Sequence, residues 1–267
     1  MSTARSSHAE PTSDSAGGAL LRRPGPELAS CVLSHVDRTP IDLGLAQKQH
    51  AALCAQLERL GLAVRVLDPL VGFADACFVE DPALVLPEVA IIGRLGTASR
   101  EAEAAALEPL LGELRPLLHI EAPNTLEGGD VLRMDDTLLT GLSGRTNHGG
   151  MRQLAHLVLE HGYRVKAAEV EGALHLKTAV TWLGGDTLLA NRRWVNLERL
   201  EGMRVIEVHP EEPFGANVLK VGEQLLASSA YPRTIERMQL TGFDVKPVDI
   251  SEFHKAEAGL TCLTQLV

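Results

Sequence analysis

A short strand pattern recurs five times along the chain, and this repeat constrains the fold more than any other feature. Each copy has two or three apolar residues, followed by a small or polar residue and a loop. The copies lie at residues 30–34, 90–93, 137–140, 187–190 and 224–227. A repeat of this kind indicates that one structural unit is built several times and packed against its own copies.

The same two elements follow each copy. A helical pattern comes first, at residues 46–60, 99–111, 149–161, 197–200 and 234–240. A strand comes second, at residues 63–67, 117–121, 163–166, 204–208 and 244–248. Glycines follow four of the helices, as is common where a helix ends: Gly61, Gly162, Gly202 and Gly242.

A third strand precedes the next copy, at residues 76–80, 130–133, 176–182, 217–221 and 260–266. Each module therefore contains strand, strand, helix and strand, and the strand near Leu33 would complete the last module. Five modules that bury their faces against one another predict a closed ring. This is an α/β fold, a five-module α/β propeller with pseudo-five-fold symmetry and its helices outside. Periodicity alone leaves an ordinary α/β sheet open as the alternative.

Chemically active residues occupy equivalent places in successive modules. In a closed ring these places face one central axis, so residues far apart in the sequence meet there. The set contains two carboxylates, a histidine, an amide and a thiol: Asp81, Glu127, His175, Asn217 and Cys262. Two further carboxylates, Glu80 and Asp130, stand close to the first two.

A thiol and carboxylates in one site constrain the substrate. An unperturbed thiol has a pKa of about 8.5 and needs a positive neighbour to ionise, whereas carboxylates raise its pKa. A cationic substrate resolves this conflict, and a planar guanidinium suits carboxylates because its N–H donors match their geometry. The Cys262 thiolate would attack the central carbon, while His175 would protonate the leaving amine and later activate water.

Each of these residues also has a plain structural interpretation. Cys262 could be a small buried apolar residue, and His175 could be a hydrogen-bonded core histidine. Glu127 could belong to a hairpin turn around Gly128. Asn217 could serve only as a structural hydrogen-bonding residue.

Composition excludes several other classes of protein. With 25 basic and 35 acidic residues, the formal net charge is −10, which argues against a nucleic-acid partner. No apolar run reaches the roughly 18 residues of a membrane span, and polar residues interrupt any signal peptide. The four cysteines form no CxxC pair and no zinc-ligand spacing, so we expect free thiols, no metal site and a cytoplasmic location.

The N-terminus differs in composition from the rest of the chain. Residues 1–27 are rich in Ser, Gly, Pro and Ala, which is typical of disordered termini. We therefore expect a disordered tail at residues 1–27 and a single catalytic α/β-propeller domain at residues 28–267.

With these residues assembled, the chain resembles the dimethylarginine dimethylaminohydrolase family, part of the guanidino-group-modifying (pentein) superfamily of five-module α/β propellers. The resemblance extends over about residues 30–266, and its motifs occur in the family's order. They are Phe78-Val-Glu-Asp81, Ile92-Gly-Arg94-Leu-Gly96 with Ser99-Arg100, Leu126-Glu-Gly-Gly-Asp130, Ser143-Gly-Arg145-Thr-Asn147, His175-Leu-Lys-Thr178, Ala230-Tyr-Pro-Arg233 and Leu260-Thr-Cys262.

The resemblance implies a role for each matching residue. Cys262 matches the nucleophile, His175 the general acid and base, and Glu127 the carboxylate that supports the histidine and holds the guanidinium. The substrate-binding matches are Asp81 and Glu80 at the guanidinium, Asp75 at the amino-acid end, Arg94 and Arg145 at the α-carboxylate, Phe78 in the pocket wall, and Ala256.

The resemblance also implies the reaction. It is hydrolysis of Nω,Nω-dimethyl-L-arginine or Nω-monomethyl-L-arginine to L-citrulline, with release of dimethylamine or methylamine through a covalent thiouronium on Cys262. The implied partner is a small cationic guanidine, with no cofactor, no metal, and a homodimer as one assembly to consider. Two alternatives stay open: an arginine deiminase-like, amidinotransferase or other guanidine-modifying enzyme, and a catalytically silent propeller that acts as a binding module.

The sequence departs from the family in three places. Residues 35–45 are shorter than the family's lid loop, so the preferred guanidine stays open. Glu257-Ala258-Gly259 stands where the family tends to have an Asp-Gly-Gly turn. The chain also ends without a basic residue.

Overall fold

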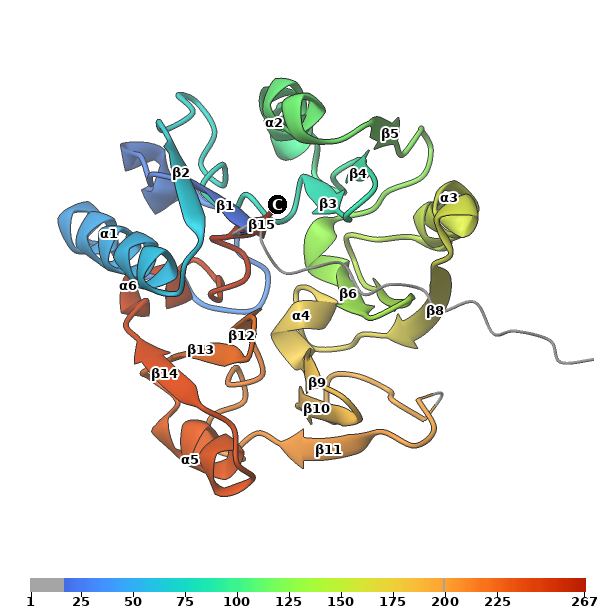
Figure 1. The fold of residues 1–267 in the computed structure, drawn as a ribbon. Helices are drawn as coiled ribbons and strands as arrows, with labels where there is room; N and C mark the ends of the chain where they lie inside the picture. The colour runs from blue at the N-terminus through green and yellow to red at the C-terminus, as the bar shows by residue number, and fades with distance from the viewer. Residues whose placement is uncertain (1–16, 199) are drawn as a thin grey trace, which may run out of the picture.

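Five three-stranded sheets surround a common centre (Figure 1). The computed structural model describes residues 17–198 and 200–267. We number the modules 1 to 5 by their sheets, each written in strand order. They are β15-β1-β2 (Gln265–Leu266, Gly18–Arg22, Ala63–Leu67), β3-β4-β5 (Ala83–Val85, Ala90–Ile92, Leu117–His119), β6-β7-β8 (Val131–Met134, Thr137–Leu142, Arg164–Glu169), β9-β10-β11 (Val180–Gly184, Thr187–Ala190, Arg204–Glu207) and β12-β13-β14 (Val218–Val221, Gln224–Ser228, Val245–Val248).

The middle strand of every sheet pairs antiparallel on one side and parallel on the other. In module 3, Leu139 of β7 lies opposite Leu132 of β6 and beside Lys166 of β8. A short turn can join an antiparallel pair, whereas a parallel pair needs a crossover. The predicted module of strand, strand, helix and strand satisfies both requirements and is confirmed.

Helices supply four of the crossovers and lie on the outside of the ring (Figure 1). They are α1 (Leu43–Arg59), α2 (Glu101–Leu114), α3 (His148–Leu157) and α5 (Pro232–Leu240). Asp42 caps α1 by accepting the Leu45 N–H at 3.0 Å, and Asn147 caps α3 by accepting the Gly150 N–H at 2.8 Å. The shorter helices are α4 (Leu176–Ala179), α6 (Ser251–His254) and the 3-10 turns Pro26–Ser30, Ala98–Arg100, Gly128–Asp130 and Leu159–His161.

The apolar core is divided among the module interfaces. One cluster joins Ile91 of module 2 to Leu138 of module 3. Another joins Leu20 of module 1 to Ala90 and Leu107 of module 2. Three further clusters occupy the remaining interfaces. Because every neighbouring pair of modules shares buried apolar surface, the ring is closed, as the repeat predicts.

The N-terminal part of the described fold differs from the prediction. The first strand is β1, Gly18–Arg22, and not residues 30–34, so the expected disordered tail to residue 27 is wrong for this stretch. The apolar run Ala19–Leu21 is almost fully buried between β15 and β2, which outweighs the polar composition around it. The rest of the expected tail, residues 1–16, lies outside the described residues.

The helix expected at residues 197–200 is also wrong, since the described part of this segment forms a turn. Asparagine side chains replace helical hydrogen bonds here. Asn191 Oδ1 accepts the Arg193 N–H at 3.1 Å, and Asn196 Oδ1 accepts the Glu198 N–H at 3.0 Å. Such side-chain turns compete directly with a helix.

In three modules the strand nearest the ring centre begins later than predicted, at Ala83, Val180 and Gln265. Tight turns occupy the preceding residues, in module 4 as the short helix α4, and each contains a hydrogen bond from an amide to the carbonyl three residues earlier. The donor and acceptor residues are Asp81 and Phe78, Thr178 and His175, and Thr264 and Thr261. These turns, and not the sheets, carry the chemically active residues.

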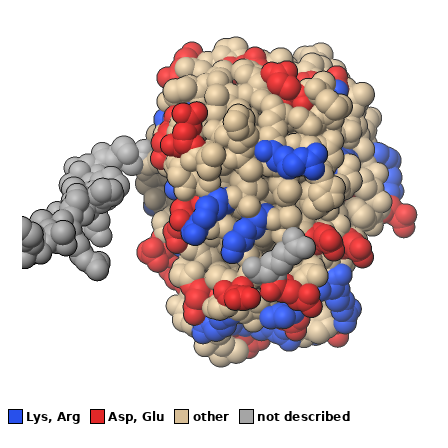
Figure 2. Space-filling model, turned by 90° about the vertical axis from the view of Figure 1, so that its right-hand side faces the viewer, with Lys and Arg blue, Asp and Glu red and all other residues tan. Residues whose placement is uncertain are grey.

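The surface carries charges of both signs. On the face in Figure 2, acidic and basic side chains are interspersed among uncharged ones. Within residues 17–198 and 200–267, no helix combines the length and the apolar character that crossing a membrane requires.

Candidate active site

A small cavity is lined by residues from modules 1 to 4. Seven of the ten predicted site residues line it: Asp75, Phe78, Asp81, Arg145, His175, Ala256 and Cys262. Residues separated by nearly 190 positions in the sequence thus meet because the ring closes.

Cys262 lies in the turn that precedes β15 and is buried. Its Sγ accepts the Gly259 N–H at 3.4 Å. Burial raises the pKa of the thiol, and the carboxylates of Asp81 and Glu80 raise it further. The resting nucleophile is therefore a neutral thiol.

His175 and Glu127 form a buried ion pair. His175 Nε2 lies 2.6 Å from Glu127 Oε2, and Glu127 Oε1 accepts the Gly96 N–H at 2.9 Å. Burial opposes charge on the imidazole, but Asp81, Asp130 and Glu127 together raise the pKa of His175 to about 9. The same ion pair lowers the pKa of Glu127 against the effect of its burial. His175 is therefore protonated at neutral pH.

Asp81 has one carboxylate oxygen engaged and one free. Oδ2 accepts the Arg100 Nη1 donor at 2.8 Å. Oδ1 is buried, has no hydrogen-bond partner among the described residues, and lies 3.7 Å from His175 Nδ1. A Cβ on Gly129 would lie 2.8 Å from both of these atoms, so only glycine permits this arrangement. Asp81 Oδ1 can therefore accept a hydrogen bond from a bound ligand.

The structure does not bring Glu80 into the cavity. Its Oε1 accepts from Lys177 Nζ at 2.6 Å, and its Oε2 accepts from Thr261 Oγ1 at 2.6 Å. Because both oxygens are engaged by protein donors, Glu80 holds the turn that carries Cys262 and is not placed to bind substrate. The plain interpretation of Asn217 fits, since its amide donates to Thr261 Oγ1 at 3.0 Å.

Arg94 is also outside the cavity. It pairs with Glu101 at 3.1 Å on a partly exposed surface. Arg100 lines the cavity, although sequence analysis assigned it only to a motif and to no role. Its guanidinium is buried against Asp81 and Glu103. The only available signal was Glu103 three residues after Arg100, which is too common a helical pair to indicate a site.

Arg145 lines the cavity as expected. Its Nη1 donates to Thr97 Oγ1 at 2.6 Å and lies 3.7 Å from Glu127 Oε1. Asp75 accepts the Val32 N–H at 3.1 Å, which joins the cavity wall to residues 31–42.

One buried trio at the cavity has the spacing of metal ligands, although Glu127, the third predicted residue outside the cavity lining, does not itself face the cavity. Atoms of Asp81, Glu127 and His175 lie within 4.8 Å of one another. A metal needs the neutral imidazole, however, and the carboxylates around His175 favour its protonated form. The donor set therefore fits a cationic ligand better than a metal ion.

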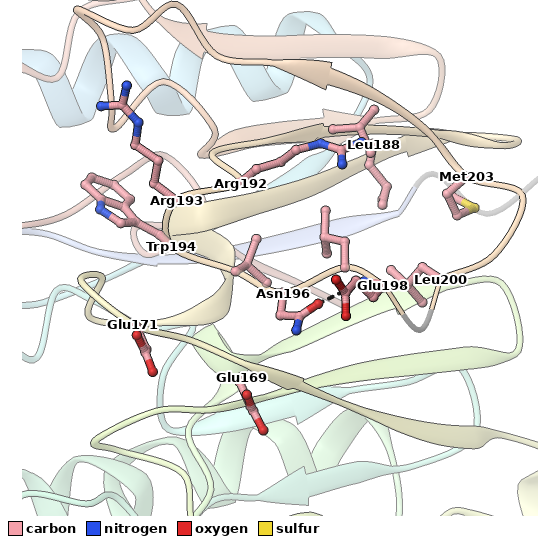
Figure 3. A pocket seen from close by; sticks show the side chains of 13 residues that line it. Glu169, Glu171, Leu188, Arg192, Arg193, Trp194, Asn196, Glu198, Leu200 and Met203 are labelled. Carbon is pink, nitrogen blue, oxygen red and sulfur yellow. Dashed lines mark hydrogen bonds between the residues drawn. The ribbon is translucent and has the colours of Figure 1, made fainter.

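A larger cavity opens beside module 4, where the described residues of the crossover form no helix (Figure 3). Leu188, Leu200 and Met203 form its apolar part, and charged residues such as Glu169 and Arg192 stand around it. The described residues that line it include neither cysteine nor histidine. Reactive groups therefore converge in the smaller cavity.

Comparison with known proteins identifies the family. A family profile described as arginine deiminase matches residues 76–225. The N(G),N(G)-dimethylarginine dimethylaminohydrolase of Streptomyces coelicolor is 39% identical over 247 residues, which is 92% of this chain and 95% of the relative. The chain belongs to the dimethylarginine dimethylaminohydrolase family.

Two solved structures of this family are similar to the chain along its length. The Pseudomonas aeruginosa enzyme, a cysteine-to-serine variant complexed with citrulline, has a TM-score of 0.89 at 31% identity and covers 94% of this chain and 98% of its own. A histidine-to-glycine variant, an adduct with S-methyl-L-thiocitrulline, has a TM-score of 0.89 at 32% identity and covers 94% and 99%. Both matches agree with the five-module fold described above.

Proposed function

We propose that this chain hydrolyses Nω,Nω-dimethyl-L-arginine and Nω-monomethyl-L-arginine to L-citrulline. One observation carries the proposal: the unpartnered Asp81 Oδ1 lies in the same small cavity as the Cys262 thiol and the His175 ring. A guanidinium N–H would satisfy this acceptor, and its carbon is the electrophile that a thiolate attacks. The name of the Streptomyces relative and the citrulline in the Pseudomonas structure support the same reaction.

The cavity offers a complementary group to each part of an arginine-like substrate. Asp81 would hold the guanidinium, and Glu127 would support it through the histidine. We assign the α-carboxylate to Arg145 and the amino group to Asp75, because both residues line the cavity and carry the complementary charge. Phe78 and Ala256 form apolar wall between them.

The substrate's positive charge starts the reaction. It lowers the pKa of the Cys262 thiol, whose proton passes to solvent because His175 is already protonated. Sγ then forms a bond to the guanidinium carbon, and His175 gives its proton to the departing dimethylamine nitrogen as the C–N bond breaks. The product of this half-reaction is a thiouronium on Cys262 beside a neutral His175.

Water completes the cycle. Neutral His175 takes a proton from water, and the resulting hydroxide adds to the same carbon. The C–S bond breaks, and the remaining hydroxyl proton leaves to solvent. Citrulline, the Cys262 thiolate and protonated His175 result, and the thiolate takes a proton from solvent to restore the resting thiol.

Product analysis with three substrates tests the proposal. Dimethylarginine, monomethylarginine and arginine are each incubated with the wild type, with Cys262→Ser and with Cys54→Ala, a control on α1. We expect citrulline from the methylated substrates, a loss of at least about a thousandfold in Cys262→Ser, and retained turnover in the control. Citrulline and ammonia from arginine would favour a deiminase, and no product from any substrate would overturn the proposal.

A further inference from the structure

Glu257 occupies a backbone conformation that usually belongs to glycine. Its φ is 57°, in the left-handed region. It follows α6, where the Ala258 N–H donates to Phe253 O at 3.0 Å and the Glu257 N–H donates to His254 O at 3.1 Å. This is the Schellman helix ending, in which glycine is common because it lacks a Cβ. A residue with a Cβ is strained in this conformation, so the glutamate side chain stands here at a cost in backbone energy.

The carboxylate of Glu257 receives three successive backbone amides. The Ser34 N–H donates to Oε2 at 2.8 Å, and the Val36 N–H donates to Oε1 at 2.6 Å. The His35 N–H also donates to Oε1. Three amides on one carboxylate form a charge-assisted contact that a glycine at 257 would not make.

The segment held in this way, residues 31–42, contains no helix or strand. Its position therefore depends on side chains from elsewhere. At one end the Val32 N–H donates to Asp75, and at the other the Asp42 N–H donates to Glu252 at 2.8 Å. Glu257 supplies the middle of this attachment.

Glu257 also faces the catalytic cavity, which it lines together with Val32 and Asp75. Glu257 also lines a second cavity, together with Val36. The segment and Glu257 thus lie between the catalytic cavity and the second cavity. A shift of the segment would move Val32 and its hydrogen-bond partner Asp75.

We infer that Glu257 is a positioning residue that fixes residues 34–36 against the catalytic cavity and so sets the affinity for the amino-acid end of the substrate. The connection runs through Val32 to Asp75, the residue assigned to the substrate amino group. This inference rests on the proposed function and deepens it. It also gives a reason for the departure from the family's Asp-Gly-Gly turn.

Three variants distinguish a positioning role of Glu257 from a contribution to stability alone. Glu257→Gly removes the carboxylate and relieves the backbone strain, so the melting temperature should not fall. Glu257→Gln keeps an acceptor oxygen without the charge. Asp37→Asn is the matched control, because Asp37 is an exposed carboxylate on the same segment whose side chain makes no hydrogen bond to the described residues.

Amide hydrogen exchange tests the contact without any need for activity. Exchange at residues 34–36 should become at least about tenfold faster in Glu257→Gly, change less in Glu257→Gln and stay constant in Asp37→Asn. Unchanged exchange in Glu257→Gly would overturn the inference. If the wild type makes no citrulline, the proposed function and the role in affinity fail together, while exchange still decides whether Glu257 holds the segment.

Steady-state kinetics tests the role in affinity. In Glu257→Gly, KM for dimethylarginine should rise about tenfold while kcat stays within about twofold, and Glu257→Gln should restore part of the loss. A fall in kcat at constant KM, or a melting temperature that falls with KM unchanged, would show a different role and overturn the inference.

Discussion

Without substrate, the Cys262 thiol and the His175 imidazole are both protonated, so neither can take a proton from the other. Burial and carboxylates raise the pKa of Cys262, and three carboxylates raise that of His175. Asp81 contributes to both increases, so this one carboxylate favours both the neutral thiol and the protonated imidazole. A cation bound beside Asp81 would lower the pKa of the Cys262 thiol, which would couple activation to the presence of substrate.

The charge state of His175 gives a prediction about pH. The pKa of the ring is raised to about 9, so the ring keeps its proton below that pH and loses it above. Glu127 contributes to the increase, so Glu127→Gln should lower the pKa and move the loss of the proton to lower pH. NMR titration of the imidazole measures this directly, and the pH at which kcat begins to fall should move in the same direction.

Asp136→Asn is the control for this titration. Asp136 is an exposed carboxylate of module 3 that pairs with Arg164 at 2.8 Å, and screening by solvent keeps its effect small. Its removal should leave the His175 titration unchanged. A titration that is the same in Glu127→Gln as in the wild type would show that Glu127 does not hold the proton on His175.

At the scale of elements, hydrophobic patterning predicted the middle strands well and the N-terminus badly. Four of the five middle strands lie where their apolar pattern puts them. The fifth was misplaced because a polar average over residues 1–27 concealed the short run Ala19–Leu21. The turns before the inner strands were also missed, since local hydrogen bonds there override the tendency of apolar residues to extend.

Strand β1 gives a prediction that the disordered-tail interpretation would not make. Leu21 is fully buried and lies beside Val66 of β2, which is 40% exposed. Leu21→Ala should lower the free energy of unfolding by about 2–5 kcal/mol, and Val66→Ala by no more than about 0.5 kcal/mol. Chemical denaturation measures both. Equal effects in the two variants would show that β1 does not stabilise the ring.

At the scale of the whole molecule, the closed ring could be predicted because a repeat leaves few ways to bury five similar faces. The convergence of Asp81, His175 and Cys262 followed from that closure. Two features of the site could not be predicted. Arg100 lines the cavity and Arg94 does not, and the Glu80 carboxylate binds protein donors where we expected it to bind substrate. Both depend on which charged side chains pair with each other in the folded protein, and spacing in the sequence carries no information about that.

A polar network at the ring centre joins four of the five modules. Thr261 Oγ1 donates to Glu80 and accepts from Asn217, whose amide also donates to Lys177 O at 3.1 Å. Lys177 Nζ donates to the other carboxylate oxygen of Glu80, Oε1. Apolar clusters join modules in pairs, whereas this network ties modules 1, 2, 4 and 5 together around the residue next to Cys262.

Removing one hydroxyl from this network should therefore affect stability and catalysis together. Thr261→Val keeps the volume but leaves Glu80 Oε2 and one Asn217 donor without a partner, which should cost about 2–4 kcal/mol of unfolding free energy. Turnover should fall as well, because the turn that holds Cys262 loses its anchor. Thr264→Val is the matched control, since the buried Thr264 hydroxyl has no partner among the described residues and its loss should be neutral or stabilising. Denaturation and kinetics on both variants decide the point, because equal effects would mean that the network does not join the modules.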